Sequence, residues 1–276
     1  MYEDKIKFSV LMSLYYKEKP EHVKECFQSL LNQSVGADEW VIVEDGSLSK
    51  ELYYILEEYQ NDYPELIRRI PLEKNRGLGL ALKEGIINCK NELIARMDTD
   101  DIARKDRFER QLKEFKKNEN LDICGSFIYE FEDKKENIIS RRSVPVTDAD
   151  IKKYQKKRSA FNHMTVMYKK SSVIEAGNYE HCPLMEDDML WVRMILNKAT
   201  CINIPECLVY ARTGKDMLQR RGGLKYFLKF CQARKKIYQL GYMSKTDYYS
   251  VNLVQLIVCI CPIYIRKIIF KHFLRG

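Results

Sequence analysis

The chain has 276 residues, 45% of them hydrophobic and 31% charged, so it can bury the core of one large α/β domain with an appendage. Its nine cysteines show no metal-ligand or redox spacing and no signal peptide is recognisable, which argues against a secreted, disulfide-held protein and predicts a cytoplasmic one. The net charge of +8 is uneven, because residues 212–276 hold 14 Lys and Arg against two Asp, and this indicates an anionic partner such as a lipid surface, nucleic acid or phosphorylated substrate.

The first part of the chain alternates short apolar runs with amphipathic segments. Strands are predicted at residues 6–14, 40–43, 67–72 and 93–97. Helices are predicted at residues 21–32, 52–63, 79–89 and about 105–117. This alternation predicts an α/β fold with a mostly parallel sheet flanked by helices, in which ligands bind at the carboxyl ends of the strands.

The second part is less regular. Strands are predicted at residues 123–131, 163–168 and 200–211, helices at 148–157 and 185–196, and a charged turn at 133–137. The sequence shows no repeat and no clean domain break before about Thr213.

An acidic run, Asp98-Thr99-Asp100-Asp101, directly follows the predicted strand at 93–97. Clustered carboxylates repel one another unless a cation joins them, and their hard oxygen atoms suit magnesium or manganese. A solvated loop that caps the next helix is the alternative. The segments 13–15 and 44–47 also lie at predicted strand ends, so three distant loops are expected to meet at one edge of the sheet.

Five segments in this order form a recognisable set: 9–15 (SVLMSLY), 43–47 (VEDGS), 75–79 (NRGLG), 97–101 (MDTDD) and 186–193 (EDDMLWVR). Over residues 6 to about 225 the chain resembles family 2 glycosyltransferases of the GT-A fold. The resemblance implies a Rossmann-like catalytic domain over residues 1–212, with a nucleotide-sugar half to about residue 101 and an acceptor half from about 102 to 212.

The resemblance also implies a donor site. The residues expected to contact the nucleotide-sugar are Ser13, Leu14, Tyr15, Asp45, Arg76 and Asp98. A carboxylate such as that of Asp45 can accept a base N–H or a ribose hydroxyl, although Asp-Gly-Ser is also good chemistry for an ordinary turn. Arg76 suits a base or phosphate, or is a surface arginine at a helix start.

In the same family pattern, Asp98 tends to the ribose and Asp100 reaches the metal that bridges the diphosphate. The Asp of a Glu-Asp pair before a Trp-containing helix is the general base, which is Asp187 here. His163 resembles a family histidine near the metal or diphosphate, while a lone histidine beside apolar residues is more often part of a core. Arg212, with Arg220 and Arg221, resembles a loop that closes over the donor phosphates, and a lipid-facing role competes with it.

Residues 251–265 are nearly all apolar and basic residues follow them. A bilayer-spanning helix needs about 20 apolar residues, so this segment suits an anchor that lies in the membrane surface. A helix docked on the catalytic domain is the alternative. We therefore expect residues 213–276 to form a helical region that associates with the membrane.

The resemblance implies an inverting glycosyltransferase that uses Mn²⁺ or Mg²⁺ and a UDP-sugar. It also implies, as the acceptor, a lipid-linked saccharide of bacterial surface polysaccharide synthesis. Because the Gln-x-x-Arg-Trp motif of processive synthases is absent, we expect transfer of a single sugar. We expect no nucleic-acid partner and a peripheral location on the inner face of the cell membrane. The alternatives are a metal-dependent nucleotidyltransferase and a non-catalytic module that binds a nucleotide-sugar or a lipid surface.

Overall fold

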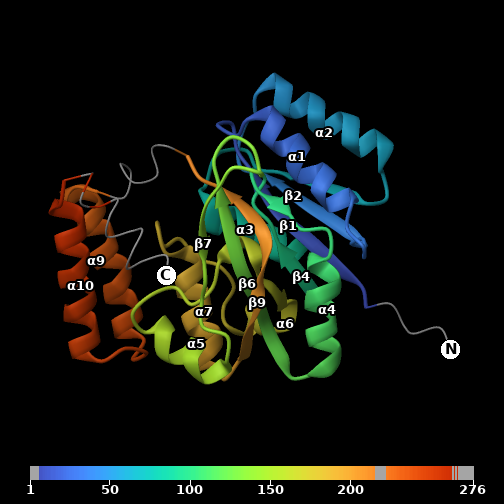
Figure 1. Cartoon of the computed structure of the whole chain (residues 1–276). Coiled ribbons are helices and arrows are strands. Elements are labelled where there is room, and N and C mark those ends of the chain that lie inside the picture. Colours follow the sequence, from blue (N-terminus) through green and yellow to red (C-terminus); the bar gives the residue numbers. More distant parts are fainter. Residues whose placement is uncertain (1–5, 215–221, 263, 265, 267–276) are drawn as a thin grey trace.

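The computed structural model describes residues 6–214, 222–262, 264 and 266. Within these residues the strands form one nine-stranded sheet in the order β3-β2-β1-β4-β8-β6-β9-β5, with β7 paired to β6 (Figure 1). The strands are β1 (Phe8–Leu14), β2 (Glu39–Glu44), β3 (Ile67–Pro71), β4 (Leu93–Arg96), β5 (Ile102–Ala103), β6 (Leu121–Phe131), β7 (Ile138–Arg142), β8 (Met167–Lys169) and β9 (Thr200–Arg212). The α/β prediction is confirmed.

The first four strands are parallel, as the alternating pattern predicted, whereas β8 and β5 pair antiparallel with their neighbours. The helices of the sheet domain are α1 (Pro20–Leu31), α2 (Lys50–Asp62), α3 (Leu78–Asn88), α4 (Arg107–Lys117), α5 (Asp148–Gln155), α6 (Lys170–Glu175) and α7 (Glu186–Leu196). Each βα connection returns the chain to the same edge, so the loops after β1, β2 and β4 lie together.

Alternate residues of the strands point to opposite faces of the sheet, and each face has its own core. Val10 and Ile42 belong to a cluster with α1, α2 and α4, while Leu11 and Val43 belong to a cluster with α3 and α7. Gly85 of α3 permits close packing on the second face, since a Cβ there would lie 2.2 Å from a Leu11 methyl group.

The predicted strand at residues 163–168 is wrong in its first half. Residues His163–Thr165 form a 3₁₀ turn, η1, and the strand β8 begins only at Met167. The cause is a local hydrogen-bond network, in which the Thr165 hydroxyl donates to the Asn162 carbonyl and accepts from the backbone N–H of Ser126. The turn lifts the His163 side chain out of the sheet and toward the carboxyl end of β4.

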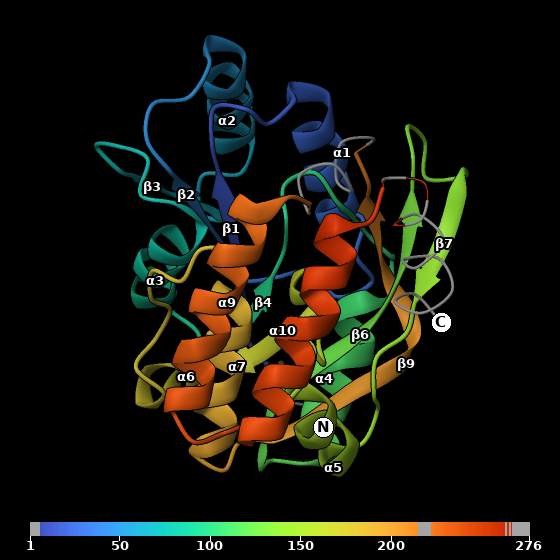
Figure 2. The same cartoon turned by 90° about the vertical axis from the view of Figure 1, so that its left-hand side faces the viewer.

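Two further helices follow the sheet domain, α9 (Leu224–Gln239) and α10 (Lys245–Ile260). Ser244 begins α10 with a capping box to Asp247, so the helix starts six residues before the apolar run. Figure 2 shows the two helices side by side in front of α7, and Phe230 and Ile237 of α9 join the core on that face. In the described ranges no helix is both long and apolar enough to cross a bilayer.

Candidate active site

The acidic run lies where β4 ends, and its three carboxylates converge. One ligand oxygen from each of Asp98, Asp100 and Asp101 lies within 4.8 Å of the others. Burial raises the pKa of Asp100 to about 6, and the charge of Asp98 adds to this effect. Burial, with the charges of Asp100 and Asp98, also raises the pKa of Asp101 well above its usual value. The cluster therefore carries repulsion that a cation would relieve.

Asp101 supplies a direct test of whether the residues suit a metal. Its side chain is buried and its Oδ1 accepts the backbone N–H of Arg212 at 2.8 Å. Its Oδ2 is buried and has no hydrogen-bond partner in the described part of the chain. A buried carboxylate oxygen without a partner is costly unless it meets a cation. The donor set of Asp100 and Asp101 therefore fits a hard divalent ion.

Asp98 differs from its two neighbours because the protein already holds both of its oxygens. Its Oδ1 lies 2.6 Å from Nη1 of Arg96, and its Oδ2 lies 3.1 Å from Nε2 of His163. Although burial opposes ionisation, Arg96 and His163 lower the pKa of Asp98 well below its usual range. Asp98 is therefore a fixed anion at the end of β4.

Asp187 lies in the first turn of α7 and faces the same point. Its Oδ2 is 3.7 Å from Nδ1 of His163, and its Oδ1 accepts a hydrogen bond of 3.3 Å from the Tyr179 hydroxyl. Asp188 turns away and accepts from Gln155 of α5 at 2.8 Å. The geometry thus separates the two adjacent acids, and of the two it is Asp187 that is linked to Asp98 through His163.

His163 connects these carboxylates, which the sequence pattern did not indicate. Its ring nitrogens face Asp98 and Asp187, and its side chain is 37% exposed. It is therefore not a buried core histidine. The expected contact with a metal or diphosphate stays a prediction.

The carboxylate of Asp45 organises the neighbouring loop. It accepts the backbone N–H groups of Arg76 at 2.6 Å and Gly77 at 3.0 Å, while Asn75 donates to its carbonyl at 3.1 Å. Gly46 has φ 84°, and a Cβ there would lie 2.5 Å from the Asn75 nitrogen, so the loops can meet only with glycine at this position. Asp45 thus holds the loop at residues 75–77, which goes beyond the ordinary local turn that the sequence left open. A base or ribose contact by this residue stays a prediction.

The other expected donor residues differ in exposure. Ser13 and Tyr15 are half-buried, and the Arg76 side chain is exposed beside the capped loop. Leu14 is fully buried in the core with α1 and α2, so its side chain points away from the cluster. Only its backbone can contribute to this site.

Arg212 is already engaged by the protein. Its Nε donates to the Asp100 carbonyl at 3.0 Å, its Nη1 donates to the Asp133 carbonyl, and its Nη2 contacts Glu25. These bonds place Arg212 as a brace on the acidic loop, so a phosphate contact would have to displace one of them. Arg220 and Arg221, which were expected to act with it, lie outside the described residues.

Three participants were not singled out from the sequence. Arg96 is buried next to Asp98, Tyr179 donates to Asp187, and Glu18 lies near the acidic run. Burial, with the charges of Asp100 and Asp98, raises the pKa of Glu18 to about 7. Only Arg96 gave a sequence signal, as a charged residue that ends an apolar strand.

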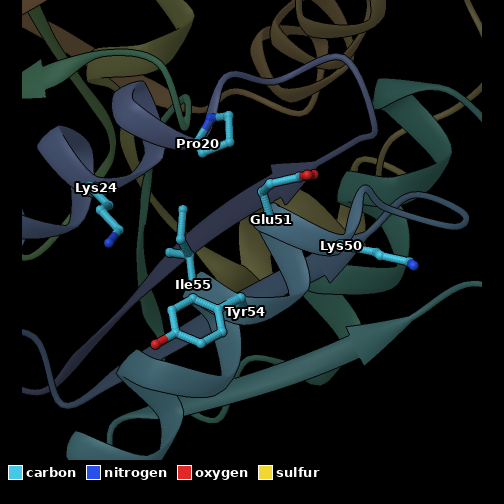
Figure 3. Close-up of a pocket in the computed structure, with 6 residues that line it drawn as sticks. All are labelled: Pro20, Lys24, Lys50, Glu51, Tyr54 and Ile55. Carbon is cyan, nitrogen blue, oxygen red and sulfur yellow. The ribbon is translucent and has the colours of Figure 1, made fainter.

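A groove of about 430 Å³ lies elsewhere, on the outer side of α1 and α2 (Figure 3). Its lining residues are Pro20, Lys24, Lys50, Glu51, Tyr54 and Ile55. Ile55 belongs to the core opposite the one that contains α7. None of the lining residues belongs to the carboxylate cluster.

Comparisons with known proteins agree with this arrangement. The family model Glycosyl transferase family 2 matches residues 9–179. The amylovoran biosynthesis glycosyltransferase AmsE of Erwinia amylovora is 35% identical over 98% of this chain and 100% of its own length. A UDP-Gal:alpha-D-GlcNAc-diphosphoundecaprenol beta-1,3-galactosyltransferase of Escherichia coli is also 35% identical, over 100% of this chain and 99% of its own.

Solved structures share the fold. S. aureus TarS 1-349 in complex with UDP-GlcNAc superposes with a TM-score of 0.64 and 18% identity, covering 83% of this chain and 65% of that one. The mannosyltransferase PcManGT from Pyrobaculum calidifontis, in complex with GDP-Man and Mn²⁺, gives a TM-score of 0.62 and 12% identity, covering 91% and 69%. At these identities the likeness establishes the architecture.

Proposed function

Since this chain belongs to glycosyl transferase family 2, the bacterial polysaccharide type, we propose that it transfers one sugar from a UDP-sugar to a lipid-linked saccharide with inversion of the anomeric centre. The observation that carries the proposal is the meeting of two carboxylate groups of different kinds at one point. Asp98, Asp100 and Asp101 form a cation-suited cluster, and Asp187 reaches the same place from α7 through His163. Membership of this family argues against the alternative function of a nucleotidyltransferase.

A uridine donor is supported by relatives of two kinds. The E. coli relative is named for UDP-Gal, and TarS was solved with UDP-GlcNAc. In this chain the loop at residues 75–77, which the Asp45 carboxylate holds, and the acidic run after β4 both lie at the carboxyl edge of the sheet. We place the nucleotide along this edge, with Asp98 toward the ribose.

Asp100 and Asp101 would hold Mn²⁺ or Mg²⁺. The pKa of Asp100 is raised, which metal binding would reverse, and Oδ2 of Asp101 is buried without a hydrogen-bond partner among the described residues. When bound, the ion neutralises charge on the diphosphate leaving group. PcManGT was solved with Mn²⁺ in a related fold. Asp98 is left to the protein and the donor.

Asp187 would act as the general base. The acceptor oxygen forms a bond to the anomeric carbon as the bond from that carbon to the diphosphate breaks, and the acceptor proton passes to the Asp187 carboxylate. Inversion requires the base on the face opposite the leaving group. Tyr179 and His163 hold Asp187 at the rim of the cluster, while Asp188 is occupied by Gln155.

The acceptor half of the proposal rests on the surface of the C-terminal helices. We propose a catalytic domain over residues 1–212 and a separate membrane-associating region over residues 213–276. On α10 the exposed apolar side chains at helical spacing are Tyr249 60%, Leu253 59%, Ile257 52% and Ile260 72%, and Leu224 of α9 is 68% exposed. A continuous exposed apolar stripe beside exposed lysines suits an anionic lipid surface.

We therefore place the protein as a peripheral enzyme on the inner face of the cell membrane, where a lipid-linked acceptor would be available. The relative named for a diphosphoundecaprenol substrate supports this class of acceptor. The alternative, in which α9 and α10 both dock on the catalytic domain, agrees with the structure for α9 but not for the outer surface of α10. Ile237 and Phe230 of α9 are buried there, but the outer stripe of α10 is not.

A thermal-shift screen tests the donor site. UDP, UDP-galactose, UDP-N-acetylglucosamine and GDP-mannose are each added with Mn²⁺ or with EDTA, because a ligand that binds the native state raises the melting temperature. We expect stabilisation by uridine compounds that depends on Mn²⁺ and is lost in Asp100→Asn. Stabilisation by none of the four would remove the donor assignment, and a GDP-only response would replace uridine by guanosine.

A further inference from the structure

Arg96 is a buried cation that the proposed transfer reaction does not itself require. It ends β4, its side chain is 1% exposed, and its Nε and Nη2 have no hydrogen-bond acceptor among the described residues. A guanidinium does not lose its proton in proteins, so its charge must be balanced by anions nearby. Its nearest anion is Asp98, whose Oδ1 lies 2.6 Å from Nη1.

Arg96 begins a chain of side chains that ends at the proposed base. From Asp98 the contacts run to His163 at 3.1 Å, from His163 to Asp187 at 3.7 Å, and from Asp187 to Tyr179 at 3.3 Å. Burial disfavours the charge of Arg96, but Asp98 and then Asp187 raise its pKa further above its usual value. The buried charge of Arg96 therefore acts both on Asp98, which is proposed to face the nucleotide-sugar, and on Asp187, the proposed base.

We propose that Arg96 is a positioning residue that holds Asp98 off the metal and, through His163, keeps Asp187 in place for the acceptor hydroxyl. This role rests on the proposed transfer reaction. Both oxygens of Asp98 are occupied by Arg96 and His163, which leaves the ion to Asp100 and Asp101. Without Arg96, Asp98 is free to turn toward the ion, and the link to Asp187 loses its anchor.

Two measurements on one variant move in opposite directions if this is right. In Arg96→Met, loss of a neighbouring positive charge and release of Asp98 strengthen binding of Mn²⁺ alone, by about fivefold or more. In the same variant kcat for sugar transfer falls by about 100-fold, because the reacting groups are misplaced, while the donor KM changes much less. General damage to the fold would instead weaken both Mn²⁺ binding and transfer.

Arg96→Lys separates charge from geometry. Lysine keeps the positive charge but not the planar fork, so we expect Mn²⁺ affinity close to that of the wild type and a kcat between those of the wild type and Arg96→Met. Arg104→Met is the matched control, since Arg104 is a paired arginine that bonds Asp106 and Glu206 outside this chain of contacts. Its Mn²⁺ affinity and kcat should equal those of the wild type.

Mn²⁺ binding is measured by electron paramagnetic resonance without nucleotide, and folding by circular dichroism. Weaker or unchanged Mn²⁺ binding in folded Arg96→Met overturns the proposal, as does an unchanged kcat. If Arg96→Met does not fold, the cycle of Arg96→Lys with Asp187→Asn decides. We expect the lysine variant to cost at least fivefold less kcat in the Asp187→Asn background than alone. Equal costs in both backgrounds overturn the role.

The wild-type protein distinguishes failure of this inference from failure of the proposed function. If the wild type binds no Mn²⁺ and transfers no sugar, the reaction itself is misassigned. If the wild type does both and Arg96→Met behaves like Arg104→Met, only the role of Arg96 fails.

Discussion

Asp100→Asn should stabilise the metal-free protein while removing its ability to bind metal. Burial and the charge of Asp98 raise the Asp100 pKa from 3.8 to about 6. The folded state therefore holds this proton more tightly than the unfolded chain, so stability is greatest below pH 3.8 and is lost as the pH rises through 6. The full loss above pH 6 amounts to about 3 kcal/mol. The neutral amide avoids it.

The expected gain at pH 8 is about 1–3 kcal/mol, since the asparagine also gives up part of the local hydrogen bonding of the carboxylate. For a chain of this size that corresponds to a rise in melting temperature of about 2–5 °C. At pH 4.5 the wild-type carboxyl is protonated in the fold, and the gain shrinks to about 1 kcal/mol or less. Addition of Mn²⁺ at pH 8 should reverse the order, because only the wild type gains binding energy.

The assay is differential scanning fluorimetry in EDTA at pH 4.5 and pH 8, then with Mn²⁺ at pH 8. Glu65→Gln is the matched control, as it also neutralises an acid but at an exposed position. It should shift the melting temperature by less than about 1 °C. A lower melting temperature for Asp100→Asn in EDTA at pH 8, or an equal gain at both pH values, would refute the reasoning.

Three further predictions concern the pH dependence of metal binding, the exposed surface of α10 and the packing of α3. Mn²⁺ affinity should fall by about tenfold per pH unit below pH 6, because protons compete with the ion for the Asp100 carboxylate. Isothermal titration calorimetry at pH 5 and pH 7.5 measures this, and equal affinities at the two pH values would contradict the prediction. Replacement of Leu253 and Ile257 together by Glu should weaken binding to phosphatidylglycerol vesicles by about tenfold or more in a flotation assay. Tyr54→Glu, an equally exposed change on α2, should leave vesicle binding intact. Gly85→Ala should cost about 1–2 kcal/mol in urea unfolding because its Cβ meets Leu11, whereas Gly36→Ala, with open space, should be neutral.

The sheet could be predicted because its first four strands carry their own signal. The apolar runs ending at Leu14 and Arg96 are buried on both faces, which is the pattern of central parallel strands. The short strand at Ile102–Ala103 and the edge strand at Ile138–Arg142 were not predicted. Both depend on partners distant in the chain, since neither has an apolar run long enough to indicate a strand by itself.

The site could be predicted only where the residue type and its position at the end of an element together indicate a chemical role. Asp98, Asp100 and Asp187 stood out as acids at element ends, and the structure groups Asp98 with Asp100 and links Asp187 to Asp98 through His163. Arg96 was visible as a charged residue that ends an apolar strand, but a lone arginine in a strand does not indicate which anions it will meet. The capping role of Asp45 also required the loop at residues 75–77, which is thirty residues away.

The central claim is that Asp187 accepts the proton of the acceptor hydroxyl. The same nearly isosteric substitution at the adjacent Asp188 serves as the control. Sugar transfer is measured for Asp187→Asn and Asp188→Asn with a UDP-sugar, Mn²⁺ and a lipid-linked acceptor, alongside calorimetric binding of UDP. We expect Asp187→Asn to bind UDP with Mn²⁺ within about threefold of the wild type and to lose transfer by about 10²–10⁴-fold. Asp188→Asn, which keeps a polar partner for Gln155, should retain most activity. Full transfer by Asp187→Asn, with UDP binding intact, would contradict the account.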